Sequence, residues 1–163
     1  MLKIRIAKLD DEKQIAKLIA MFRCELKSLK GIEANLNITG AQDEFKEYMN
    51  AKYPIFVAAN GNNLIGYLVC KIENGVVWAE YLFVEKKYRR CKVATKLYKK
   101  AEKLAESLGN DTVYNWVHPN NDKMINFLSN IGYNVLNLIE IRKAYKDEKL
   151  NRIINIDKHD YLY

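Results

Sequence analysis

The sequence predicts an α+β fold with a mixed, mostly antiparallel central sheet flanked by helices. Two apolar runs, residues 64–73 and 76–84, are joined by Asn74-Gly75, a dipeptide typical of tight turns between antiparallel strands. Stretches with apolar residues at intervals of three and four, the period of a helix, lie before and after these runs. Strands and helices therefore occupy separate segments of one chain, which is the pattern of an α+β domain.

The first fifty residues predict one strand and two helices. Residues 2–7 alternate apolar and charged side chains, as expected for a strand with one buried face. Asp10 or Asp11 can cap the helix that follows. The apolar face of this helix consists of Ile15, Leu18, Ile19, Phe22 and Leu26. Residues 30–40 contain two glycines and predict a loop, and a short helix is expected over 42–50.

Three consecutive strands form the predicted centre of the sheet. Pro54 opens a strand over 55–59, and a turn leads from it into the hairpin strands 64–73 and 76–84. The helix after this hairpin has apolar residues at Val93, Leu97, Ala101, Leu104 and Leu108. Gly109 follows directly and is expected to end that helix in the left-handed conformation.

The last third of the chain predicts a strand, a helix and a strand. The strands are expected over 112–117 and 133–142, and the helix over 121–130, where Gly132 ends it. Residues 144–163 are polar apart from a small apolar patch, and their pattern assigns no element. Because the chain has no Gly/Ser-rich linker, one domain is expected, with this C-terminal segment packed on it.

The composition restricts the class of protein. The 163 residues are enough to bury a core, and no apolar run approaches the ~20 residues that a membrane-spanning helix needs. The N-terminus shows no long apolar segment of a signal peptide, and the three cysteines are widely spaced. Reduced thiols, a cytoplasmic location and no membrane partner are therefore expected. Two scattered histidines predict no metal site.

The chain carries 27 lysines and arginines against 20 acidic residues, a net charge of +7. A lysine-rich solvated surface explains this charge, and so does attraction for a phosphate-bearing cofactor or a nucleic acid. Local basic clusters occur only at 86–92 and 96–100. Because the sequence lacks the stacking aromatics and recognition helices of nucleic-acid binders, that class is disfavoured.

The most informative stretch joins the strand over 76–84 to the following helix. It reads Tyr-Arg-Arg-Cys-Lys-Val-Ala over residues 88–94 and is strongly basic. The first N–H groups of a helix have no partner within the helix, and the helix dipole favours negative charge there. Arg89, Arg90 and Lys92 add formal positive charge at the same place. The sequence therefore predicts an anion site for a phosphate-bearing cofactor.

This stretch resembles a motif of the GNAT superfamily of acetyl-CoA-dependent N-acetyltransferases, in which Arg/Gln-x-x-Gly-x-Gly/Ala follows an apolar strand ending in Val. Here residues 89–94 match it, after Leu-Phe-Val at 82–84. A second family pattern, Asn followed by a short helix and Gly-Phe/Tyr, matches residues 121–133. The resemblance implies an N-acetyltransferase domain over 1–143, and leaves residues 144–163 without an assigned role.

The resemblance also implies where acetyl-CoA, the co-substrate, is bound. In this family the strand matching 76–84 diverges from the strand matching 112–117, and the pantetheine arm lies between them. Backbone groups of the first strand would bond this arm, and backbone amides at the start of the next helix would hold the pyrophosphate. Asn121 would bond the arm, cap its own helix, or do both. The implied contact residues are Leu82, Phe83, Val84, Arg89, Arg90, Cys91, Lys92, Val93, Ala94, Thr95 and Asn121.

Glu80 is the candidate catalytic base. It is ionisable within an apolar strand and, by even spacing, shares a strand face with Leu82 and Val84. Burial would raise its pKa toward a useful range, and it could act through a water molecule. The alternative is a solvent-facing or structurally paired glutamate.

Two positions depart from the family pattern. Lys92 occupies the place of the first Gly in the motif, where its backbone N–H stays available if φ is negative. Leu128 occupies the place of a Tyr that protonates the leaving thiolate in many members, so the general acid is unknown and water can serve. Tyr133 is close in sequence but is expected to be a core aromatic.

These features predict an acyltransferase that moves an acetyl group from acetyl-CoA directly to a primary amine, without a metal. The alternative, motivated by Lys92 and Leu128, is a CoA-binding, degenerate GNAT module without efficient turnover. The amine can be a small molecule or a protein amine, and a homodimer is left open. In such folds the loop between the first two helices, here about 28–41, and the C-terminal region select the amine. Three further side chains either line the acceptor groove or only pack their strand, namely Tyr114, Trp116 and His118.

Overall fold

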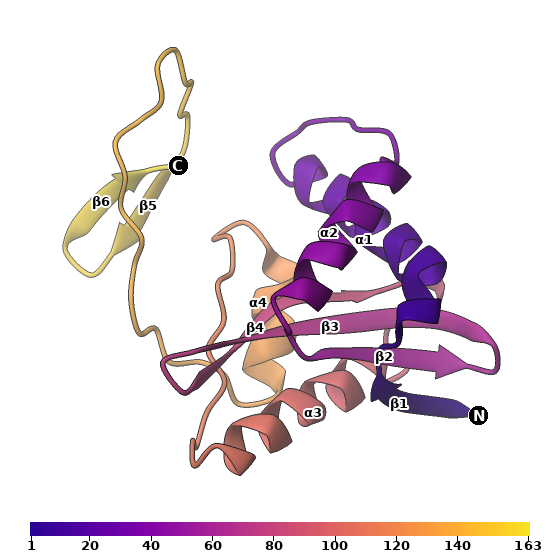
Figure 1. Ribbon diagram of the computed structural model, residues 1–163. Helices are drawn as coiled ribbons and strands as arrows, with labels where there is room; N and C mark the ends of the chain where they lie inside the picture. Colours follow the sequence, from indigo (N-terminus) through magenta and orange to yellow (C-terminus); the bar gives the residue numbers. More distant parts are fainter. The chain divides into compact units, whose positions relative to one another are not determined.

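The computed structural model describes residues 1–163 and divides into two compact units, Met1–Gly132 and Tyr133–Tyr163. The first unit holds an antiparallel sheet in the order β1-β2-β3-β4 (Figure 1). Its strands are β1 (Leu2–Ile6), β2 (Ile55–Asn60), β3 (Asn63–Glu73) and β4 (Val76–Val84). Its helices are α1 (Glu12–Ser28), α2 (Ile38–Asn50), α3 (Val93–Ser107) and α4 (Asp122–Asn130), with short 3-10 helices at Leu9–Asp11 and Lys86–Tyr88. The predicted α+β class is confirmed.

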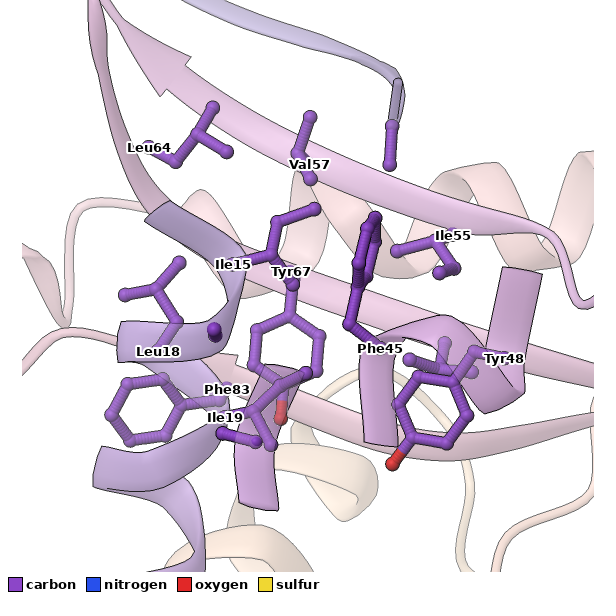
Figure 2. Close-up of a cluster of buried hydrophobic side chains, with 14 of the residues drawn as sticks. Ile15, Leu18, Ile19, Phe45, Tyr48, Ile55, Val57, Leu64, Tyr67 and Phe83 are labelled. Carbon is purple, nitrogen blue, oxygen red and sulfur yellow. The ribbon is translucent and has the colours of Figure 1, made fainter. Parts of the chain in front are cut away.

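Helices α1 and α2 cover one face of the sheet, and α3 covers the other (Figure 1). Figure 2 shows the core under α1 and α2, where side chains from both helices meet side chains from the strands. Ile15, Phe45 and Tyr67 are almost fully buried there. Because both faces of the sheet are covered, the first five residues of β2 are all buried and do not alternate with polar ones.

Local sequence signals are confirmed where backbone conformation alone decides the structure. Asn74 and Gly75 have φ values of 52° and 78°, the left-handed pair that a tight hairpin turn requires. Gly109, with φ 78°, ends α3 as predicted. Helix α2 begins earlier than predicted because the Asn37 side chain accepts a hydrogen bond from the Gly40 N–H at 2.9 Å and caps it.

The predicted strand over 112–117 is wrong in extent. Only Tyr114 pairs with β4, in a parallel bridge to Trp78. The Tyr114 N–H donates to the Val77 carbonyl, and the Tyr114 carbonyl accepts from the Ala79 N–H, both at 2.9 Å. The next residue, Asn115, instead bonds the Tyr98 hydroxyl of α3 through its side chain. The ladder therefore stops after one bridge, although the segment has the composition of a strand.

The second unit, Tyr133–Tyr163, is described by itself. The strand predicted over 133–142 is absent, and its apolar side chains, such as Val135 and Leu138, are largely exposed. A strand needs a neighbouring strand to pair with, and neither sheet of the structure includes this segment. The terminal residues, for which the sequence assigned no element, form an antiparallel hairpin of β5 (Ile153–Ile156) and β6 (His159–Leu162). None of the helices in the structure is long and apolar enough to cross a membrane.

Candidate active site

The loop between β4 and α3 presents backbone N–H groups and positive charge to solvent. Helix α3 begins at Val93, and no side chain caps its first turn, in contrast to α2 and α4, which asparagine side chains cap. The N–H groups of that turn are therefore left for a ligand. Arg90, Cys91 and Lys92, which precede the helix, are all exposed. This arrangement has the features of the anion site that the sequence predicts, and the binding of an anion there stays a prediction.

Lys92 adopts the conformation that glycine adopts most readily. Its φ is 58°. A negative φ was expected to keep its backbone N–H available, and the structure does not show one. Arg90, two residues earlier, also has a positive φ, of 61°. Each non-glycine residue held in the left-handed region costs roughly 1–2 kcal/mol. The loop thus takes the shape that glycine would favour, at the expense of backbone strain.

Lys92→Gly should raise the free energy of unfolding by about 0.5–1 kcal/mol, because relief of the strain exceeds the entropy that glycine loses on folding. Urea unfolding would measure this change. Lys92→Ala is the control, since it removes the same charge but keeps a Cβ and hence the strain. Equal stabilities of the glycine and alanine variants would contradict the argument.

The Arg89 side chain connects the end of β4 to α1 through hydrogen bonds and does not extend toward the start of α3. Its guanidinium donates two hydrogen bonds to the Glu25 carboxylate, at 2.8 and 2.6 Å, and its Nε donates to the Val84 carbonyl at 2.8 Å. Hydrogen bonding from Arg89 holds the pKa of Glu25 below its usual range, against the opposing effect of burial. The implied contact of Arg89 with the cofactor stays a prediction. In this structure its guanidinium is hydrogen-bonded to Glu25 and to the Val84 carbonyl.

A β-bulge in β4 lies at Glu80. Tyr81 pairs with Val69 and Ala79 with Cys70, so Glu80 is the extra residue between them. The even spacing that placed Glu80 on the face of Leu82 therefore does not run through this point of the strand. Glu80 is half-buried. Bulges change the direction of side chains and often occur next to active sites. The catalytic role of Glu80 stays a prediction.

The remaining residues of β4 differ in their surroundings. The Phe83 side chain belongs to the core under α1 and α2, and Val84 is also buried, while Leu82 is half-buried. Only backbone groups of Phe83 and Val84 can therefore face a ligand. Gly66 of β3 packs against this end, where an added Cβ would lie 2.8 Å from the Phe83 carbonyl oxygen.

The pairing of residues 112–117 with β4 is confined to the bridge at Tyr114. Trp78, Tyr114 and Trp116 form an aromatic cluster there, with ring centroids 5.1 and 4.9 Å from that of Trp78. Trp116 is 67% exposed, so it is not a core residue, whereas Tyr114 is half-buried. Trp116 therefore does not serve to fill the core, and a place for it in an acceptor groove stays a prediction.

Asn121 caps α4, since its side-chain oxygen accepts from the Met124 N–H at 3.2 Å. The cap uses only the oxygen, so the amide nitrogen can still donate to a ligand. Leu128 is 7% exposed and packs in the interior, and it offers no proton. The structure contains no group of three or more His, Cys, Asp or Glu side chains that could hold a metal ion.

A second feature, which the sequence did not reveal, is a cavity of about 380 Å³ between α1, α2 and β4, called here the α2 pocket. Its side chains are those of Arg23, Asp43, Glu44, Glu47, Tyr48 and Tyr81. Arg23 donates to Glu44 from Nε at 3.0 Å, and the Tyr48 hydroxyl bonds the same carboxylate. The Arg23 guanidinium also lies 4.4 Å from the centroid of the Tyr81 ring. The spacing of the charged residues along α2 indicates that they lie on one side of the helix. It does not indicate that Arg23 and Tyr81 lie opposite them.

Comparisons with known proteins agree with this architecture. The family model described as "Acetyltransferase (GNAT) family" matches residues 20–133, more than half of the chain. This chain therefore belongs to the GNAT family of acetyltransferases. No curated protein matches the sequence.

Solved structures with the same fold share little sequence with the chain. PaiA N-acetyltransferase from Thermoplasma acidophilum, solved with coenzyme A, aligns with a TM-score of 0.70 at 17% identity, over 81% of this chain and 89% of that chain. AAC(6')-Iy, solved with a CoA–acetylneamine bisubstrate analogue, aligns with a TM-score of 0.67 at 19% identity, over 89% and 99%. A GNAT acetyltransferase from Staphylococcus aureus aligns with a TM-score of 0.64 at 19% identity, over 81% and 84%.

Proposed function

We propose that this protein is an N-acetyltransferase that moves an acetyl group from acetyl-CoA directly to a primary amine. The observation that carries the proposal is the uncapped N-terminus of α3, which follows the loop after β4 and the exposed residues Arg90 and Lys92. Backbone N–H groups and two cations in one place suit a pyrophosphate. Neighbouring structures solved with coenzyme A and with a bisubstrate analogue support the same assignment.

Each part of the site would have a separate task. Bound acetyl-CoA supplies an electrophilic thioester carbonyl. The start of α3, from Cys91 to Thr95, would hold the phosphates, and the exposed backbone of β4 near Leu82 would orient the arm of the cofactor. Glu80 would take the proton of the amine, directly or through water, while the new C–N bond forms and the C–S bond breaks. With Leu128 buried and apolar, the leaving sulfur would take its proton from solvent.

Acetyl-CoA at about a hundred times its dissociation constant should stabilise the fold by ~2.7 kcal/mol, which raises Tm by roughly 5–10 °C for a chain of this size. Differential scanning fluorimetry measures this shift, with inorganic polyphosphate as the control for general polyanion binding. Arg90→Glu should reduce the acetyl-CoA shift, because it reverses a charge beside the helix N-terminus. If millimolar acetyl-CoA leaves Tm unchanged, the proposal is wrong.

The second candidate is a CoA-binding module without efficient turnover, favoured by Lys92 in the left-handed conformation and by the buried Leu128. Release of free thiol from acetyl-CoA in the presence of an amine panel separates the two. A thermal shift with acetyl-CoA and no amine-dependent thiol release would favour the module. Amine-dependent thiol release would establish the enzyme.

A further inference from the structure

The carboxylates of the α2 pocket give it a charge opposite to that of the whole chain. Three of them, Asp43, Glu44 and Glu47, face the single cation Arg23, whereas the chain has a net charge of +7. Arg23 neutralises Glu44. Asp43 and Glu47 belong to no ion pair and are exposed to solvent. Because they lie four residues apart on one face of α2, they present two free carboxylates together.

A buried hydroxyl without a hydrogen-bond partner lies near residues that line this pocket. Tyr67 is fully buried, and its Oη makes no hydrogen bond in the structure. Burial raises the pKa of Tyr67, with smaller electrostatic effects of Arg23, Glu44 and Tyr81, all of which line the pocket. Figure 2 shows the Tyr67 hydroxyl directed away from β2, toward the side to which the Tyr48 hydroxyl also points. A ligand N–H group that reached Oη would satisfy it.

The pocket lies beside the candidate base. Tyr81, which forms part of its wall, directly follows Glu80 in the bulge of β4. The wall also includes the Tyr48 ring, which stands 5.6 Å from the Tyr81 ring between centroids. Faces of aromatic rings attract cations, and Arg23 already lies over the Tyr81 ring, so a second cation would be drawn by the two free carboxylates. A cation in the pocket would therefore be a short distance along β4 from the proposed reaction.

We infer that the acceptor is a small amine with at least two amino groups. One ammonium group is held by Asp43 and Glu47, and a second, neutral amino group reaches the thioester beside Glu80. This inference rests on the acetyl transfer proposed above. Only the second nitrogen reacts: it forms the amide bond and loses a proton, the C–S bond breaks, and the thiol leaves. The ammonium group in the pocket is unchanged and serves to bind and orient the acceptor.

The test compares 1,4-diaminobutane with butylamine, which has the same length and one charge fewer. The release of thiol is measured at saturating acetyl-CoA. The value of kcat/KM should be about tenfold higher for the diamine than for butylamine, because two partly exposed ion pairs contribute about that much. The double variant Asp43→Asn/Glu47→Gln should remove this preference. The control variant Glu106→Gln/Asp111→Asn removes the same charge from exposed residues outside the pocket and should keep the preference.

Equal rates for the two amines in the wild type, or a preference that survives in the double variant, would overturn the inference. So would a lysine-containing peptide that reacts much better than the diamine, because that result would assign a protein acceptor. Retention of the acetyl-CoA thermal shift by the double variant shows that it is folded.

Direct binding of 1,4-diaminobutane, measured by calorimetry without acetyl-CoA, separates this inference from the proposed function. Binding that the double variant loses, together with no thiol release from any amine, would support the cation site and refute the enzyme. Thiol release with simple amines, together with no difference in diamine binding between wild type and variant, would support the enzyme and refute the cation site.

Discussion

Replacing Arg89 with leucine should lower the free energy of unfolding by about 2–3 kcal/mol, the value expected when a partly buried carboxylate loses charge-assisted hydrogen bonds. The side chains of Arg89 and Glu25 are only 28% and 24% exposed, so water replaces the lost bonds incompletely. The Val84 carbonyl also loses its bond from Nε. Urea unfolding at neutral pH measures the change.

The adjacent Arg90 provides the control. It is exposed and makes no ion pair, so Arg90→Leu should change the free energy of unfolding by less than about 0.5 kcal/mol. Arg89→Lys keeps the charge but loses the bidentate geometry, and should fall between the wild type and the leucine variant. Similar losses in the Arg89→Leu and Arg90→Leu variants would contradict the assigned role.

The contribution of Arg89 should depend on pH in one direction. Because Arg89 lowers the pKa of Glu25 in the folded protein, the stabilisation is fully present above the unfolded pKa of about 4.3. It is lost as the pH falls through the lower, folded pKa, where Glu25 becomes protonated. The difference in stability between wild type and Arg89→Leu should therefore be constant near neutrality and shrink in acid. A difference that grows in acid would show that another group is responsible.

Arg89 also illustrates what the sequence can predict about this site. The basic stretch before α3 and the order of strand, turn and helix are local features, and the structure has them. The partner of Arg89 is 64 residues away on α1, and nothing in the spacing of the loop points to Glu25. The sequence predicted a positive charge at Arg89, after the end of β4. Tertiary packing decides that this charge pairs with Glu25.

The same distinction explains the other differences. The Asn74-Gly75 turn follows from backbone conformation alone and was predicted correctly. The strands over 112–117 and 133–142 have suitable composition, but a strand forms only where a neighbour supplies hydrogen bonds along it. The α2 pocket depends on the packing of Arg23 against Glu44, which belongs to a different helix. A bulge such as that at Glu80 cannot be recognised from the amino-acid pattern of an apolar strand.

The largest effect on activity is expected from Glu80→Gln, which should lower turnover by about 10²–10⁴-fold at neutral pH, the contribution typical of a general base. Glutamine has the same shape and hydrogen-bonding reach but cannot accept the proton of the amine. Acetyl-CoA affinity and stability should change little, because Glu80 is half-buried and lies outside the ladder pairing of β4. Rates of thiol release at saturating acetyl-CoA and amine measure the loss.

The pH dependence of this loss distinguishes a base from a residue that only shapes the strand. At high pH a larger fraction of the amine is already neutral, so the deficit of the Gln variant should shrink as the pH rises. A purely structural role of the bulge would give a deficit that does not vary with pH. Glu73→Gln, at the exposed end of β3, is the control and should retain full activity, since its ion pair with Lys71 is a surface contact. Full activity of Glu80→Gln at every pH would exclude Glu80 as the base and leave solvent in that role.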